Sequence, residues 1–267
     1  MAGITLRDWL AEQPYTLTLG SGFFGFFGHF GVLKALLDAG LPPARLTGAS
    51  SGALVAACYA SGMSIEAMQQ LLFTMKRQDF WDPGWAIWRG GLLKGEQFRA
   101  QMRATFPSTH FDALQVPLAL SVYNASRQRT EVIDSGDLVD ATYASCALPV
   151  LFQPLRRNGE TLLDGGVKDR PALAAVADDE RVLIHHLAAK SPWRRADDPA
   201  LRPPQRGNGT TLVLVGLTRC SPFKLERGSL AFAEAYATTT ARLAQPWQPL
   251  MSGNVHAAVP PANAVGP

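Results

Sequence analysis

The stretch YTLTLGSGFFGFFGHFGVLKALLDAGLPPARLTGASSGALVAACYAS, residues 15–61, contains the order strand, glycine turn, helix twice in succession. Residues 15–19 alternate threonine with larger apolar side chains and end at a glycine, which is typical of a short strand. Residues 29–39 carry apolar side chains at helical spacing, and a glycine and two prolines end that helix. Residues 45–49 and 53–61 predict a second strand and a second helix. The repetition indicates parallel α/β architecture.

Composition bounds the class of protein. The chain has 267 residues, of which 47% are hydrophobic, so a single α/β domain with a large core is expected. The net charge of +3 is small, and no stretch of lysine and arginine is dense enough to follow a phosphate backbone. We therefore predict no nucleic-acid partner.

The N-terminal segment and the cysteines bear on the compartment. Residues 1–13 mix charged and apolar side chains and lack the apolar centre of a signal peptide. The longest apolar stretch, residues 53–60, is far shorter than the roughly 20 residues that span a bilayer. Cys58, Cys146 and Cys220 have no metal-binding spacing, which indicates reduced thiols. A cytoplasmic protein is expected, and export by a route without a signal peptide is left open.

The second glycine turn, Gly48-Ala49-Ser50-Ser51-Gly52, has the pattern G-x-S-x-G. Between a strand and a helix, this turn holds its central serine at a strained and exposed apex. The flanking glycines, Gly48 and Gly52, avoid collisions in so tight a turn. Glycine- and serine-rich turns also produce the pattern by chance, so its position between strand and helix is what makes Ser50 the candidate nucleophile. Ser51 then begins the helix.

The first glycine turn, GSGFFG at residues 20–25, fits two interpretations. A dinucleotide-binding turn requires an acidic residue about 20 positions later, at the end of the next strand, but that strand leads to Gly48 and Ser50 instead. We favour an oxyanion hole made of backbone N–H groups. The candidate donors are those of Gly20, Ser21, Gly22, Phe23, Phe24, Gly25 and Ser51.

A third motif, Asp164-Gly165-Gly166, follows the apolar residues 161–163. By itself it is an ordinary turn. The candidate partners for a Ser-His-Asp triad are His29, His110, His185, His186 and His256. His185 and His186 lie inside a predicted strand, His256 lies in a predicted disordered tail, and no histidine has a persuasive setting. A dyad in which a carboxylate directly activates the serine is therefore the better hypothesis.

Taken together and in this order, the three motifs resemble the patatin-like phospholipase family. Residues 28–40 and 48–62 are similar to its first helix and its serine turn, and residues 134–154 to the segment before its aspartate. The resemblance covers about residues 15–170. It implies a three-layer α/β fold, with a central, mostly parallel sheet flanked by helices. It further implies a catalytic dyad of Ser50 and Asp164, with no metal and no organic cofactor.

The activity implied by this resemblance is hydrolysis of carboxylic ester bonds in lipids, of the phospholipase A, lysophospholipase or lipase type. A lipid transacylase with the same dyad is an alternative, and a nucleotide-binding module is a more distant one. Many bacterial members carry a cation in the glycine loop, whereas this loop has phenylalanines instead, as in the branch that includes triacylglycerol lipases. The head-group preference is left open.

The resemblance also divides the chain. Residues 15–245 are expected to form the acyl hydrolase domain, residues 1–14 an N-terminal extension, and the Ala/Pro-rich residues 252–267 a disordered tail. Contact with a membrane or lipid-droplet surface is a further expectation. Most of the aromatic side chains at residues 23–30 and 80–88 are predicted to pack in the core, and Trp81 and Trp85 are the candidates for insertion into lipid.

Overall fold

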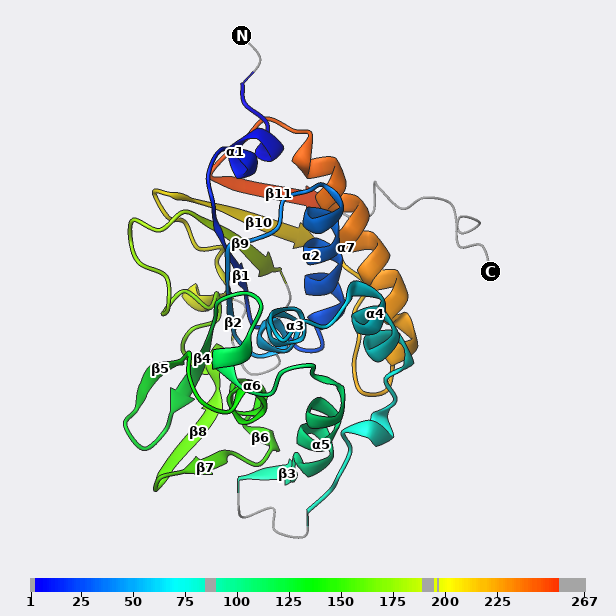
Figure 1. The fold of residues 1–267 in the computed structure, drawn as a ribbon, viewed down its shortest axis with the longest axis vertical. Coiled ribbons are helices and arrows are strands. Elements are labelled where there is room, and N and C mark those ends of the chain that lie inside the picture. Colours follow the sequence, from blue (N-terminus) through cyan, green and yellow to red (C-terminus); the bar gives the residue numbers. More distant parts are fainter. Residues whose placement is uncertain (1–2, 85–89, 189–194, 196, 255–267) are drawn as a thin grey trace.

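The computed structural model describes residues 3–84, 90–188, 195 and 197–254 (Figure 1). The described helices are α1 (Leu6–Glu12), α2 (Phe26–Asp38), α3 (Ser51–Ala60), α4 (Ile65–Thr74), α5 (Glu96–Thr105), α6 (Leu138–Cys146) and α7 (Gly228–Leu243). The main sheet contains β1 (Thr16–Leu19), β2 (Arg45–Gly48), β4 (Leu118–Asn124), β5 (Arg129–Ile133), β7 (Leu155–Arg157), β8 (Glu160–Asp164), β9 (Val182–Leu187), β10 (Gly209–Val215) and β11 (Leu250–Asn254). A small second sheet pairs β3 (Gly91–Leu93) with β6 (Val150–Phe152).

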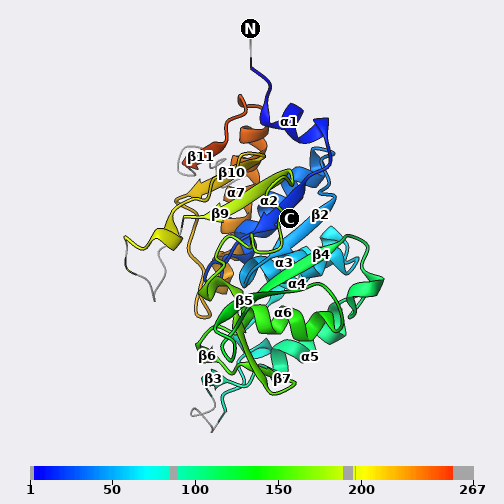
Figure 2. The ribbon, with the colours of Figure 1, turned by 90° about the vertical axis from the view of Figure 1, so that its left-hand side faces the viewer.

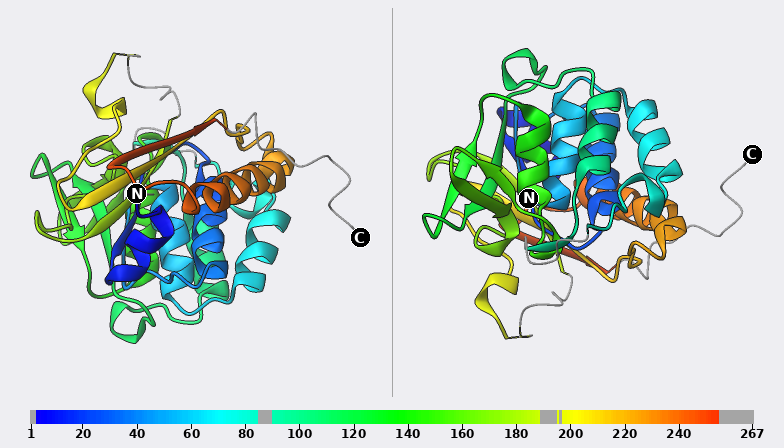
Figure 3. Two further views of the ribbon diagram at one scale, coloured as in Figure 1. Left: turned by 90° about the horizontal axis from the view of Figure 1, so that it is seen from above. Right: turned by 90° about the horizontal axis from the view of Figure 1, so that it is seen from below.

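The main sheet is mostly parallel. Its strands follow the order β11-β10-β9-β1-β2-β4-β8-β7, and β5 pairs with β4 in addition. The neighbours from β11 through β4 are parallel, whereas β5, β7 and β8 form antiparallel pairs. Figures 2 and 3 show the twisted sheet with the blue and cyan helices grouped on one side of it. The predicted α/β fold, with a mostly parallel central sheet flanked by helices, is confirmed.

Strand β1 lies at the centre of this sheet, between β2 and β9, and all of its residues are buried. Helices α2 and α7 pack closely against each other. A Cβ atom at Gly31 of α2 would lie 2.5 Å from the carbonyl oxygen of Phe232 in α7, so only glycine permits this approach. The two glycine turns leave β1 and β2 at the same edge of the sheet, because these neighbouring strands are parallel.

The N-terminal extension and the end of the chain both join the domain. Helix α1 buries Leu6, Trp9 and Leu10, and the Trp9 ring stacks on Trp247 with 5.6 Å between centroids. Residues 252–254 were expected in a disordered tail, and this expectation was wrong. They belong to β11, because the exposed edge of β10 offers them a parallel partner that composition does not reveal. Residues 255–267 lie outside the described residues.

Within the described part of the chain, no helix combines the length and the apolar character needed to cross a membrane.

Candidate active site

Ser50 lies in the turn between β2 and α3, with a backbone φ of 54° and ψ of −123°. A positive φ is uncommon for a residue other than glycine and indicates local strain. The motif glycines make the turn possible. A Cβ atom at Gly48 would lie 2.6 Å from the Cα of Ala53, and one at Gly52 would lie 1.9 Å from the carbonyl oxygen of Leu19. A side chain at either position would therefore displace the serine.

Two consecutive residues of α6 hold the strained peptide of Ser50. The Ser50 N–H donates to Ser145 Oγ over 3.1 Å, and the Cys146 thiol donates to the Ser50 carbonyl oxygen over 3.0 Å. Ser145 Oγ in turn donates to the carbonyl oxygen of Ser121 in β4 over 2.7 Å. Both polar backbone groups of Ser50 thus have partners, which offsets part of the cost of its conformation.

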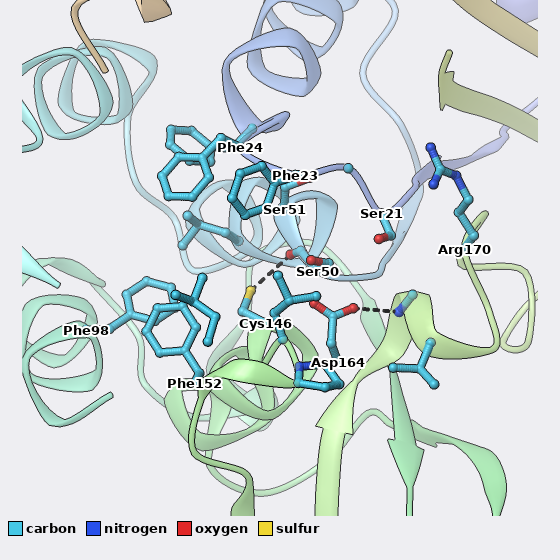
Figure 4. A pocket seen from close by; sticks show the side chains of 18 of the residues that line it. Ser21, Phe23, Phe24, Ser50, Ser51, Phe98, Cys146, Phe152, Asp164 and Arg170 are labelled. Atoms are coloured by element: carbon cyan, nitrogen blue, oxygen red, sulfur yellow. Dashed lines mark hydrogen bonds between the residues drawn. The ribbon is translucent and has the colours of Figure 1, made fainter. Parts of the chain in front are cut away.

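Asp164 ends strand β8, and Figure 4 shows its carboxylate beside Ser50. Its Oδ1 accepts a hydrogen bond from the Gly166 N–H over 2.7 Å. Oδ2 is buried and makes no hydrogen bond of ordinary length within the described residues. The turn after it also needs glycine, because a Cβ atom at Gly165 would lie 2.1 Å from the Ser121 carbonyl oxygen. One carboxylate oxygen is thereby oriented by the backbone while the other is left for a proton.

Burial controls the charge of this carboxylate. Asp164 is only 1% exposed, and this burial raises its pKa to about 6 from the ordinary 3.8. The Ser50 side chain and the Gly166 N–H lower the pKa, but by less than burial raises it. The carboxylate is therefore a stronger base than an ordinary aspartate, and it is still mostly ionised at neutral pH.

A hydrogen-bonded chain connects the serine turn to the aspartate turn through β4. Ser121 accepts from Ser145 through its carbonyl oxygen, and its own Oγ donates to Asp169 Oδ2 over 2.5 Å. The Asp169 N–H donates to the Gly165 carbonyl oxygen over 2.9 Å. The relative position of Ser50 and Asp164 therefore depends on side chains that neither motif contains.

The structure narrows the set of oxyanion donors. The N–H groups of Gly20, Ser21 and Gly25 donate to the carbonyl oxygens of His185, Arg170 and Gly22 over 3.3, 2.7 and 3.0 Å. Their prediction as donors is therefore wrong, since a backbone N–H already paired within the protein is not aimed at a ligand. The remaining candidates, whose N–H groups have no partner among the described residues, are Gly22, Phe23, Phe24 and Ser51.

The described histidines lie outside the site. His29 and His185 are buried with their Nδ1 atoms 2.8 Å apart, and burial lowers the pKa of His29 to about 3 and that of His185 well below its usual value. His186 is also buried, with its pKa lowered to about 4, and His110 is exposed. None of these lines the cavity at Ser50, and His256 lies outside the described residues. A neutral histidine pair of this kind packs the core.

Ser50 and Asp164 line one cavity of about 520 Å³. Most of its wall is apolar, including Phe24, Leu54, Phe80, Phe98, Leu148 and Phe152. Phe98 and Phe152 lie on the side of the cavity opposite the glycine loop (Figure 4). Sequence reasoning missed four of these wall residues, Leu54, Phe98, Leu148 and Phe152, although residues 148 and 152 fall in the stretch 134–154 that carries part of the resemblance. Such a cavity accommodates an apolar chain whose reactive end meets Ser50.

One cation reaches this cavity although the glycine loop has none. Arg170, six residues after Asp164, lines the wall and is only 6% exposed, and its guanidinium donates to the Leu187 carbonyl oxygen over 3.1 Å.

Cys146 is partly buried, whereas Cys58 and Cys220 are buried, and all three are free thiols, as expected. Cys146 is the cysteine that lines the cavity, and its thiol contacts the Ser50 carbonyl oxygen.

The mostly parallel α/β sheet, the strained serine turn and the buried carboxylate at one cavity are the features of a serine hydrolase fold with a carboxylate in place of a histidine. The sequence model of patatin-like phospholipases matches residues 17–176. The chain belongs to the patatin-like phospholipase family.

Two curated relatives illustrate the match. The lysophospholipase nte1 of Emericella nidulans is 29% identical over 174 residues, which are 62% of this chain and 11% of that protein. An uncharacterised protein of the NTE family from Mycobacterium bovis is 28% identical over 163 residues, which are 60% of this chain and 45% of that protein. The chain thus spans only a part of the length of these relatives. The solved structure of VipD from Legionella pneumophila aligns with a TM-score of 0.48 and 16% identity over 75% of this chain and 50% of VipD.

The buried carboxylate generates a prediction about stability. Because the pKa of Asp164 is higher in the folded protein than in the unfolded chain, the folded protein holds a proton that the unfolded chain releases between about pH 4 and pH 6. The free energy of unfolding therefore falls as the pH rises through this window, by about 3 kcal/mol in total. Asp164→Asn should stabilise the protein by about that much more at about pH 8 than at about pH 4, as measured by urea unfolding. An equal effect at both pH values would contradict the assignment.

The support of the serine turn generates a second prediction. Ser145→Ala removes the acceptor of the Ser50 N–H, and an unpaired buried donor costs about 1–3 kcal/mol. We expect that loss of stability together with slower labelling of Ser50 by a fluorophosphonate. Thr142→Val is the matched control, because Thr142 lies in the same helix but its hydroxyl donates to Leu138. Equal labelling rates for the two variants would show that Ser145 does not position Ser50.

Proposed function

We propose that this chain is a serine lipid acyl hydrolase, a carboxylic ester hydrolase of the phospholipase A, lysophospholipase or lipase type. The observation that carries the proposal is the placement of Ser50 on a strained turn beside the buried Asp164, at the wall of one apolar cavity. Family membership supports the same activity, as does the naming of curated relatives as lysophospholipases.

In the first half-reaction, Ser50 Oγ attacks the ester carbonyl carbon and its proton passes to Asp164 Oδ2. With a pKa of about 6, Asp164 is roughly nine-tenths ionised at pH 7. The unpaired backbone N–H groups of Gly22, Phe23, Phe24 and Ser51 are the proposed donors to the developing oxyanion, and removing one such donor typically costs roughly 2.7–4 kcal/mol. The C–O bond to the alcohol then breaks, and Asp164 returns the proton to the leaving oxygen.

In the second half-reaction, water attacks the acyl-enzyme and Asp164 accepts its proton. The carboxylic acid leaves, and Ser50 regains its hydrogen from Asp164. An alcohol in place of water would give acyl transfer, so the two outcomes share one intermediate. The apolar wall holds the acyl chain in both half-reactions. In this proposal Ser50 supplies the nucleophile, Asp164 supplies the base, and unpaired backbone N–H groups supply the oxyanion donors.

The catalytic unit that we propose extends beyond residues 15–245. Helix α1 and strand β11 pack on the same domain, the former through Trp9 and the latter through its pairing with β10. A lipid substrate and contact with a lipid surface are part of the proposal, and a cytoplasmic location stays an expectation from the sequence.

The dyad is tested with variants assayed on p-nitrophenyl esters and phospholipids. Ser50→Ala and Asp164→Asn should each lower kcat by a factor on the order of 10³ or more while the circular dichroism spectrum is unchanged. Ser51→Ala is the matched control, since it removes the neighbouring hydroxyl but keeps its N–H, and it should keep most of the activity. Normal turnover by Ser50→Ala would exclude Ser50 as the nucleophile. Product analysis with an added alcohol distinguishes hydrolysis from transfer.

The pKa of Asp164 predicts the acid side of the pH profile. Only the ionised carboxylate accepts the serine proton, so kcat/KM should fall as the pH drops through about 6, whereas an ordinary aspartate would lose activity near 4. The measurement is kcat/KM for a soluble, uncharged ester between about pH 4 and pH 9. A profile that stays flat down to pH 5 would contradict a buried Asp164 base.

A further inference from the structure

Two exposed apolar side chains stand at the mouth of the cavity. Phe23 is 42% exposed and Val150 is 72% exposed, and both line the cavity that contains Ser50. Val150 also has a φ of 72°, a conformation that is a clear outlier for a β-branched residue. The strained backbone and the exposure of an apolar side chain to water both cost free energy. Backbone strain of this kind clusters at functional sites.

A third exposed apolar side chain lies close to the same cavity. Phe223, in the segment before α7, is 67% exposed and packs edge-on against Trp81 with 5.9 Å between centroids. The Arg77 guanidinium lies 5.5 Å from the Trp81 ring and 5.0 Å from the Phe223 ring. Arg77 lies in the chain between Met75 and Phe80, which both line the cavity, so this stack is adjacent to cavity-lining residues.

The role of Trp81 differs from the one that the sequence suggested. Trp81 was a candidate for insertion into lipid, but its side chain is only partly exposed and packs against the core. It supports Phe223, which is the ring that reaches solvent. Trp85, the other candidate, lies outside the described residues.

The segments that carry this stack are rich in exposed cations. Lys76 and Arg77 lie in one of them, and Lys224 and Arg227 in the other. None of the four forms an ion pair with any described residue. The acids of the same two segments are Asp79, whose carboxylate accepts from the Lys76 N–H over 2.7 Å, and Glu226. The net charge beside the apolar side chains is positive.

We propose that Phe23, Val150 and Phe223, together with these cations, form a docking rim for a bilayer surface that contains anionic phospholipid. The apolar side chains enter the interface, and the cations contact the lipid phosphates. Docking in this orientation places the cavity mouth against the lipid, so an acyl chain reaches Ser50 without crossing water. The choice of a lipid partner rests on the proposed function, but docking itself is measurable without catalysis.

The experiment measures cosedimentation of the full chain with vesicles of pure phosphatidylcholine and of phosphatidylcholine with phosphatidylglycerol. The test variants are Phe223→Ser and Arg77→Gln, because neither residue lines the cavity. The matched controls are Ile4→Ser and Arg7→Gln. Ile4 is 54% exposed, and both control residues lie at the far end of α7, about 24 Å away by the rise of its 16 residues.

Wild type should prefer the anionic vesicles and should be released by salt. Each test variant should bind them about fivefold more weakly and hydrolyse vesicle lipid correspondingly more slowly, with unchanged turnover of a soluble short-chain ester. The controls should behave as wild type, and Ser50→Ala should bind fully while hydrolysing nothing. Loss of binding only in the test variants supports the rim even if no hydrolysis is found for wild type, in which case the proposed function alone fails.

Equal binding by wild type and the test variants would overturn the proposal. So would equal losses in the controls, no preference for anionic vesicles, or a wild type that binds neither kind of vesicle and instead self-associates through this face.

Discussion

The left-handed backbone of Ser50 is the constraint on which the rest of the site depends. A serine at φ 54° is strained, and the surrounding structure has to hold it there. Glycines at 48 and 52 make room for the turn, and α6 holds both polar groups of the Ser50 peptide through Ser145 and Cys146. Through Ser121 the same support extends to the turn after Asp164. The proposed nucleophile and its proposed base are therefore positioned by one connected set of contacts.

The burial of Asp164 puts stability and reactivity in opposition. Removing the carboxylate from water raises its pKa and makes it a better proton acceptor, while the folded protein becomes less stable once the group is ionised. A single hydrogen bond from Gly166 orients one oxygen and leaves the other available. The same apolar wall that destabilises the charge would hold the acyl chain in the proposed reaction, so one cavity would serve both the proposed base and its substrate.

Sequence reasoning located the elements near the two glycine turns closely, because strong local signals mark them. Helix α2 begins three residues before the predicted start at His29, because the apolar Phe26 and Phe27 extend its buried face. Helix α6 begins directly after Asp137, whose side chain caps it. The short strands β3, β6, β7 and β11 were not predicted, since three to five residues carry too little periodicity and each depends on a partner strand.

By itself the sequence determined the parallel α/β class and the serine turn, because glycine spacing and strand–turn–helix order are local properties. Asp164 became the candidate partner of Ser50 only because no histidine had a persuasive setting and the three motifs occur together. Tertiary structure alone decided which N–H groups of the glycine loop are left unpaired, since those of Gly20 and Ser21 donate to carbonyl oxygens of residues distant in the chain. It also decided the pKa of Asp164 and the contacts of Ser145 and Cys146 with Ser50. Likewise, only the tertiary structure made the Phe223 side chain more exposed than that of Trp81. Each of these depends on burial or on contacts between residues far apart in sequence, which no local pattern encodes.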